Sequence, residues 1–117
     1  MAIWIRVFFP PSGEPHSPED IILALPSKGE KGQILHRLET LSSLNLQDWS
    51  STGWAKNIEG EIWQLKTDTH RIYYCLDQRA IVVVHVCRKK GQKARRQDIR
   101  RAEINYAEYM AQKRGSK

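Results

Sequence analysis

Lysine and arginine side chains gather in this sequence where short apolar segments end. The segment from residue 88 to 101 has eight Lys or Arg among its fourteen residues, and only Asp98 carries the opposite charge. It directly follows residues 81–87, an almost continuous apolar run typical of a buried strand. Cations held on a rigid strand can bind a phosphate backbone and stabilise a phosphate that gains negative charge in a reaction. The alternative is a solvated basic face that only aids solubility.

The candidates for phosphate chemistry stand at the ends of predicted strands. Arg71 opens one strand, where a guanidinium can be held rigidly and grip two phosphate oxygens. Lys66 ends the preceding strand, and a short hairpin would place it near the same rim. Lys89 and Lys90 end a third strand, where neighbouring residues point to opposite faces, so only one would reach a reacting phosphate. We favour Lys90 for that role and Lys89 for supporting the backbone of a nucleic acid.

Each of these assignments has a competing explanation. Arg71 could pair with Asp68 or Glu61, and Lys66 could be an ordinary solvated lysine. Three further cations could bind flanking phosphates or could equally be plain surface charges: Lys93, Arg95 and Arg96.

Two histidines are candidates for a general base, because imidazole titrates near neutral pH. His85 lies inside the apolar strand, where a lone histidine is more often a satisfied core group. His70 stands beside Arg71, nearer a strand end. Tyr73 and Tyr74 point to opposite faces of their strand, so one of them, for which we take Tyr73, could stack on a base. Core packing is the competing explanation for either tyrosine.

The charge is unevenly distributed along the 117 residues, a length that predicts one domain, 1–117. Residues 1–60 hold 5 Lys/Arg and 7 Asp/Glu, whereas residues 61–117 hold 14 and 6. The basic half is therefore the expected contact surface for an anionic partner, and the first half is the expected scaffold.

Cysteine usage and hydropathy favour a cytoplasmic protein without a metal or cofactor. Cys75 and Cys87 lie in strand-like runs, and with His70 and His85 they show no CxxC or HxxxH spacing, so we expect reduced thiols and no metal site. No apolar stretch has the length of a signal peptide or approaches the roughly 20 residues of a membrane span.

The pattern of apolar residues predicts an α+β fold with the order β-α-α-β-β-β-α. Helices are expected from Ser17 to Pro26, over 29–44 and over 95–113, and residues 45–60 are expected to form a connecting loop. Strands are expected over 3–9, 61–66, 71–76 and 80–87, and the short turns between the last three predict a mostly antiparallel sheet. A stripe on the last helix should pack on this sheet: Ile99, Ala102, Tyr106 and Tyr109.

Read in order, three motifs resemble those of the HigB/RelE-like toxins of bacterial toxin–antitoxin pairs, particularly the phage-derived branch. They are EIWQLK at 61–66, HRIYY at 70–74 and IVVVHVCRKK at 81–90, followed by Ala102 and Tyr109 on the last helix. The chain departs from the family pattern in three places. Lys66 stands where Arg is usual, Cys87 where Phe is usual, and Gln64 where some relatives place a catalytic Lys.

The resemblance implies a RelE-like fold and an endoribonuclease that cuts mRNA, usually in the ribosomal A site, without a metal. The 2′-hydroxyl of one nucleotide would attack the adjacent phosphate, giving a cyclic phosphate and a free 5′-hydroxyl. The implied partners are a cognate antitoxin, a small helix-turn-helix protein, together with mRNA and the ribosome. Two alternatives remain open: a non-catalytic poison of the ParE type that inhibits DNA gyrase, and a plain nucleic-acid-binding module.

Overall fold

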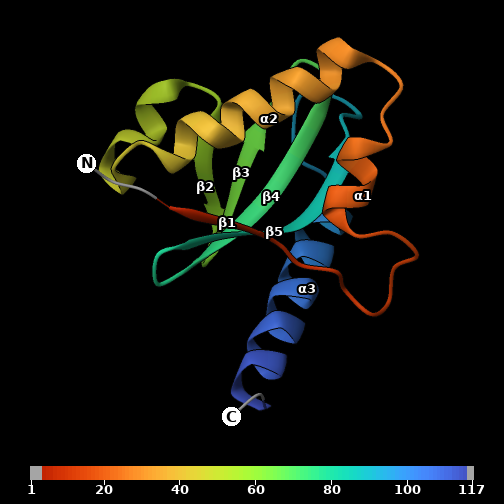
Figure 1. The fold of residues 1–117 in the computed structure, drawn as a ribbon, viewed down its shortest axis with the longest axis vertical. Coiled ribbons are helices and arrows are strands. Elements are labelled where there is room, and N and C mark those ends of the chain that lie inside the picture. The colour runs from red at the N-terminus through yellow and green to blue at the C-terminus, as the bar shows by residue number, and fades with distance from the viewer. Residues whose placement is uncertain (1–3, 116–117) are drawn as a thin grey trace.

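The computed structural model describes residues 4–115 and shows a five-stranded mixed sheet with helices on both faces (Figure 1). The strands run in the spatial order β1-β5-β4-β3-β2, with β1 parallel to β5 and every other pair antiparallel. Their bounds are β1 (Ile5–Phe8), β2 (Ala55–Glu59), β3 (Ile62–Lys66), β4 (His70–Asp77) and β5 (Ala80–Arg88). The predicted α+β class is confirmed, and the predicted order holds apart from one additional strand.

That additional strand corrects the prediction that residues 45–60 form only a loop. Two turns of 3₁₀ helix, η1 (Leu46–Asp48) and η2 (Ser50–Thr52), lead through Gly53, at a φ of +84°, into β2. β2 forms an edge of the sheet, and Lys56 and Asn57 in its middle are exposed. An edge strand with polar residues has little apolar alternation, which is why the sequence pattern did not reveal it.

Three α-helices account for the predicted helical segments. α1 (Pro18–Leu23) begins after Ser17, whose hydroxyl accepts a hydrogen bond from the Asp20 amide in a capping box. α2 (Lys28–Ser42) begins after Ser27, whose hydroxyl accepts a hydrogen bond from the Glu30 amide, and α3 (Arg96–Gly115) covers the predicted C-terminal helix. No helix among residues 4–115 is long and apolar enough to cross a membrane.

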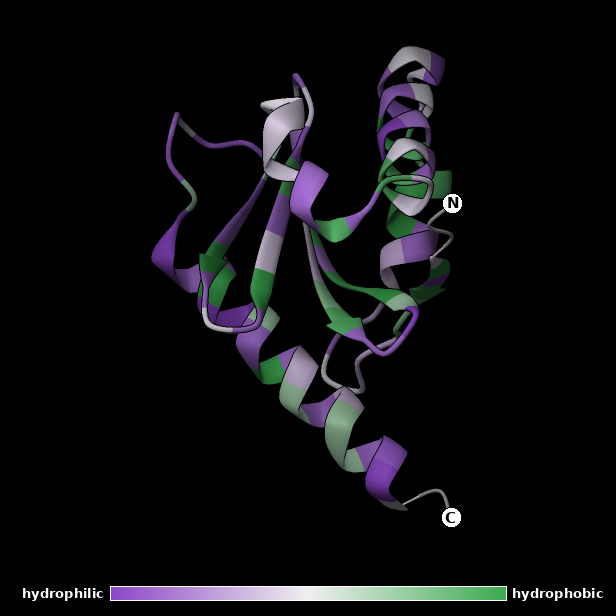
Figure 2. Cartoon of the chain, turned by 90° about the vertical axis from the view of Figure 1, so that its left-hand side faces the viewer, coloured by the Kyte–Doolittle hydropathy of each residue, from purple (hydrophilic) through white to green (hydrophobic). Residues whose placement is uncertain are grey.

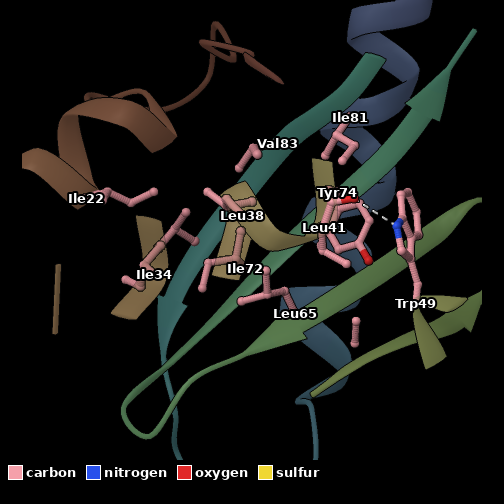
Figure 3. Packing of buried hydrophobic residues seen from close by; sticks show 12 residues of the cluster. Ile22, Ile34, Leu38, Leu41, Trp49, Leu65, Ile72, Tyr74, Ile81 and Val83 are labelled. Carbon is pink, nitrogen blue, oxygen red and sulfur yellow. Dashed lines mark hydrogen bonds between the residues drawn. The ribbon is translucent and has the colours of Figure 1, made fainter. Parts of the chain in front are cut away.

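The sheet separates two apolar cores (Figures 1 and 2). α1 and α2 cover one face, where Ile34, Leu38 and Leu41 of α2 meet residues of the central strands (Figure 3). Trp49 is fully buried in this core, and its indole N–H donates to the Leu41 carbonyl at 3.1 Å. Its ring lies 5.2 Å from that of Trp63 and 5.5 Å from that of Tyr74, centroid to centroid, so this loop residue closes one end of the core.

α3 covers part of the opposite face and packs mainly on β5 and β4. The predicted stripe from Ile99 to Tyr109 packs there as expected. Asn105 is also almost completely buried, and its amide donates to the Val84 carbonyl at 2.8 Å. Because Val84 is bulged out of register with β4, that hydrogen bond gives its carbonyl a partner on the helix side.

Asp77 fastens the C-terminal half of α3 to the turn between β4 and β5. Lys113 Nζ lies 2.5 Å from its Oδ1, and the Tyr109 hydroxyl donates to its Oδ2 at 2.6 Å. The hydrogen bonds from Lys113 and then Tyr109 lower the pKa of Asp77 below its usual value of 3.8. The ionised carboxylate therefore stabilises the folded state above about pH 4, and this contribution is lost as the pH falls through the lowered pKa.

Asp77→Asn is expected to lower the melting temperature at pH 7. Below about pH 4 the melting temperatures of the variant and the parent protein should converge, because the protonated Asp77 of the parent resembles an amide. Thermal melts followed by circular dichroism at several pH values measure this convergence. Asp48→Asn is the control, because Asp48 is exposed on η1 and makes no ion pair among residues 4–115. A gap between Asp77→Asn and the parent that stays constant down to pH 3 would contradict the assignment.

Candidate functional site

A pocket of about 330 Å³ opens on the α3 side of the sheet. It lies between residues of β2, β3 and β4 and the segment 92–94. Four cations line it, one from each contributing segment: Lys56, Lys66, Arg71 and Lys93. Its other walls are amide and apolar side chains: Asn57, Ile58, Gln64, Gln92 and Ala94. None of these lining residues is acidic, so the pocket is suited to an anion.

The register of the strands explains why these side chains meet. Lys66 and Arg71 are directly opposite each other on β3 and β4, and Lys56 of β2 is opposite Gln64 of β3. Residues opposite each other share a face of the sheet, as do residues two apart in one strand. Hence four side chains project from the face of the sheet that α3 only partly covers: Lys56, Gln64, Lys66 and Arg71.

Arg71 is the best-positioned cation of the pocket. Its side chain is 4% exposed, and its two terminal nitrogens donate to Gln64 Oε1 at 3.2 Å and to the Gly91 carbonyl at 3.0 Å. Among residues 4–115 no carboxylate pairs with Arg71, so the competing explanation of an ion pair with Asp68 or Glu61 is not what the structure contains. A guanidinium that is buried without a counter-ion is costly, and an anion bound in the pocket would compensate it.

The structure brings Lys66, Arg71 and Lys93 together but not Lys89 and Lys90. Lys89 lies back over the preceding hairpin, where its Nζ donates to the Thr67 carbonyl at 3.2 Å. Lys90 is exposed and does not line the pocket. β5 ends at Arg88, and the chain then turns through Gly91, at a φ of +123°, which brings Lys93 rather than Lys90 to the pocket.

Of the eight cations in residues 88–101, three pair with carboxylates that are distant in sequence and one pairs locally. Arg95 pairs with Asp98 at 3.0 Å, as local sequence allowed. Arg96, however, pairs with Glu59 of β2 at 2.8 Å, and neither Arg95 nor Arg96 lines the pocket. Two more cations also pair with distant carboxylates: Arg88 with Glu30 at 3.2 Å, and Arg101 with Glu14 at 3.5 Å.

Neither predicted histidine lines the pocket. His70 lies next to Arg71 in β4 and therefore on the other face of the sheet, where it is 3% exposed and its Nδ1 is 2.7 Å from the Thr69 hydroxyl. Burial, assisted by the charge of Arg88, lowers the pKa of His70 and favours the neutral ring. The sheet separates the side chains of His70 and Arg71, so the structure does not bring His70 to the pocket and agrees with the competing explanation of a satisfied core group.

His85 lies on the α3 face with its Nε2 3.0 Å from Asp98 Oδ1, and its ring stacks on Tyr73 with centroids 5.6 Å apart. Tyr73 is fully buried and presents no ring face to a base, which agrees with core packing, the competing explanation for this residue. Tyr74 is equally buried in the opposite core, which confirms that the two tyrosines point to opposite faces.

Asp98, which pairs with both His85 and Arg95, is held in its charged form. Burial alone would raise the pKa of Asp98, but the hydrogen bonds from His85 and Arg95 outweigh it and leave the pKa below the usual value of 3.8. Burial is also the main reason that the pKa of the nearby Cys87 thiol rises to about 12, with the charge of Asp98 adding to it. Cys87 in the free protein is therefore a neutral thiol.

Comparison with protein families shows the family to which the chain belongs. The model of the family described as phage-derived protein Gp49-like (DUF891) matches residues 20–107, which include β2–β5 and most of α3. The chain belongs to this family. The match confirms the phage-derived part of the resemblance in the sequence, whereas the HigB/RelE-like activity stays a prediction. A search of curated proteins gives no match.

The pocket of this Gp49-like protein is equipped for charge stabilisation. Its lining residues supply four cationic side chains and three amides, but no histidine, carboxylate, thiol or phenol. Sequence analysis did not identify Lys56 because it did not identify β2. In the structure, Lys56 lies on this edge strand directly opposite Gln64. Gln64, noted only as a departure from the family pattern, binds Arg71 and so positions the guanidinium.

Proposed function

We propose that this Gp49-like protein is the toxin of a type II toxin–antitoxin system and an mRNA endoribonuclease that acts on the ribosome. The observation that carries the proposal is Arg71, a buried guanidinium that pairs with no carboxylate of residues 4–115 and lies in a pocket lined by three lysines. Family membership and the resemblance to HigB/RelE-like toxins support the toxin role. The cytoplasm is the corresponding compartment, and a helix-turn-helix antitoxin is the corresponding partner.

The reaction we propose is attack of an RNA 2′-hydroxyl on the adjacent phosphate. The attacking oxygen loses its proton to water and forms a bond to phosphorus, while the bond to the 5′-oxygen breaks and that oxygen takes up a proton from water, which leaves a cyclic phosphate and a 5′-hydroxyl. The phosphate carries extra negative charge in the transition state, so cations already held in place stabilise it more than the ground state. Arg71 is suited to bind two phosphate oxygens, and Lys66 opposite it to bind the same group.

Proton transfer sets a limit on how this pocket would work. Its lining residues lack a group that is a good base at neutral pH, since its ionisable side chains are lysines and one arginine. We therefore propose that alignment of the RNA on the ribosome and charge stabilisation supply most of the rate enhancement. We therefore expect the protein to cut translated mRNA and not free RNA.

An antitoxin that covers the pocket would both block RNA and compensate the buried charge of Arg71. We expect a carboxylate of the antitoxin at that position, because such a pair gains from both effects.

Expression of the chain without an antitoxin tests the proposal. We expect growth arrest together with new mRNA 5′ ends that carry a hydroxyl and disappear when translation is blocked. Intact mRNA together with inhibited DNA gyrase would favour the ParE-type alternative. Salt-sensitive RNA binding without cut ends, in cells or on purified ribosomes, would favour a plain binding module.

Lys56→Ala should weaken binding of single-stranded RNA and lower the slope of log affinity against log salt by about 0.7, because one phosphate contact is lost. The measurement uses purified protein and an RNA with 2′-O-methyl groups, which binds but cannot be cut. Lys28→Ala is the matched control, since Lys28 is an exposed lysine at the start of α2 on the other side of the sheet. Equal slopes for the two variants would remove Lys56 from the RNA site.

A further inference from the structure

Three side chains with metal-binding atoms meet outside the cationic pocket. His85 and Cys87 are two apart in β5 and share the face toward α3, and Asp98 in the first turn of α3 lies over them. One donor atom from each, a ring nitrogen, the Sγ and a carboxylate oxygen, lies within 4.8 Å of the others. His85 and Asp98 keep 13% and 10% of their side chains exposed, so the cluster is sheltered but open to solvent.

We propose that His85, Cys87 and Asp98 form a binding site for Zn²⁺, with water as the fourth ligand. Nitrogen, thiolate and carboxylate are the donors that Zn²⁺ takes in proteins, and three protein ligands with one open position is a familiar arrangement for it. The inference goes beyond the proposed function, since none of the three residues lines the cationic pocket.

The spacing of the donor atoms is close to what the ion requires. Tetrahedral ligands about 2.0–2.3 Å from Zn²⁺ lie roughly 3.3–3.8 Å from one another. His85 Nε2 and Asp98 Oδ1 are 3.0 Å apart, so they need to separate by a few tenths of an ångström. The donor atoms all lie within 4.8 Å of one another, so the most widely separated pair closes by at most about 1–1.5 Å, a distance that side-chain rotation can supply.

The surroundings of the cluster suit a bound cation. Arg95 donates to Asp98 Oδ2 at 3.0 Å, which orients the carboxylate and leaves Oδ1 toward His85. Such hydrogen bonds to ligating carboxylates are the usual support of metal sites. Tyr73 stacks on His85, and its hydroxyl is buried without a hydrogen-bond partner among the described residues. A water molecule on the ion would supply a polar group to this side of the core.

The ligands offset the charge of the ion. Cys87 Sγ gives up its proton to water and becomes a thiolate, which together with the Asp98 carboxylate offsets the two charges of Zn²⁺ and leaves the Arg95 guanidinium as the remaining positive charge. Linear spacing rules predicted no metal here because the donors come from alternate positions of a strand and from a helix that follows a loop. Only the packing of α3 on β5 brings them together.

The test starts from protein freed of metal by a chelator and titrated with Co²⁺, whose bond to a thiolate gives a charge-transfer absorption in the near ultraviolet. We expect one equivalent to produce this absorption and Zn²⁺ to abolish it by displacement. Cys87→Ala should lose the absorption and lower Zn²⁺ affinity by at least about 100-fold, and Asp98→Asn should lower the affinity by about 10- to 100-fold.

Cys75→Ala is the matched control, because Cys75 is the other thiol on this face of the sheet and has no histidine or carboxylate donor grouped with it among the described residues. Circular dichroism establishes that each variant is folded. Absence of stoichiometric binding, or equal Zn²⁺ affinity in the parent, Cys87→Ala and Asp98→Asn, would overturn the site. The readout is metal binding alone, so RNA cleavage can fail or succeed independently of it.

Discussion

Arg71→Ala is expected to reduce mRNA cleavage on purified ribosomes by roughly 10²–10³-fold, or about 2.7–4 kcal/mol, the typical cost of removing one preorganised donor to a transition-state oxyanion. The expectation follows from the geometry of the side chain, which is buried and held by Gln64 and Gly91, so its charge needs no reorganisation when the phosphate charge grows. Single-turnover cleavage of a ribosome-bound mRNA measures the effect, because it isolates chemistry from product release.

Two further variants separate charge from geometry at this position. Arg71→Lys retains a cation but loses the planar fork, so we expect it to recover only part of the activity. Arg79→Ala is the control, since Arg79 is exposed in the β4–β5 turn and makes no ion pair among residues 4–115. Cleavage by Arg71→Ala at the parental rate would exclude Arg71 from the reaction.

Stability must be followed alongside cleavage, because Arg71 also contributes to packing. Its removal leaves Gln64 Oε1 and the Gly91 carbonyl without a donor, which costs about 1–3 kcal/mol for each group that water does not reach. Thermal melts of the variant tell whether lost activity reflects lost folding.

The sequence was sufficient for the part of the site that depends on strands and short turns. Lys66 and Arg71 were predicted near one rim because the turn of residues 67–69 is too short for anything but a hairpin, and the register confirms them opposite each other. The same reasoning gave the two faces of β4, with Tyr73 and Tyr74 in different cores. In these elements a local period of two residues determines where each side chain points.

The rest of the site depends on contacts between distant segments, which periodicity does not encode. Lys93 rather than Lys90 reaches the pocket because of the turn at Gly91. Arg96 of the basic segment is neutralised by Glu59, a residue 37 positions away on the edge strand that sequence analysis missed. Of the cations in residues 88–101 only Lys93 lines the pocket, so the basic segment contributes less to the site than the sequence suggested.

The same missed region carries the largest expected effect on stability. Trp49→Ala should lower the free energy of unfolding by about 3–5 kcal/mol, the usual cost of truncating a buried aromatic residue. That is a large fraction of the roughly 5–15 kcal/mol by which domains are stable. Urea or thermal unfolding followed by circular dichroism measures it, and we expect the midpoint to fall with little change in the steepness of the transition.

Trp54→Ala is the matched control, because Trp54 is only partly buried and stacks beneath Arg37, with the guanidinium carbon 5.2 Å from its ring. It should cost less, about 1–2 kcal/mol, by loss of a smaller apolar area. Trp49→Phe separates the two contributions of Trp49, since it retains an aromatic ring but leaves the Leu41 carbonyl without the indole N–H. Equal losses in Trp49→Ala and Trp54→Ala would mean that residues 45–54 are a peripheral loop, as their composition suggested. A larger loss in Trp49→Ala would show that this segment closes the core beneath β3 and β4, whose other face bears the cationic pocket.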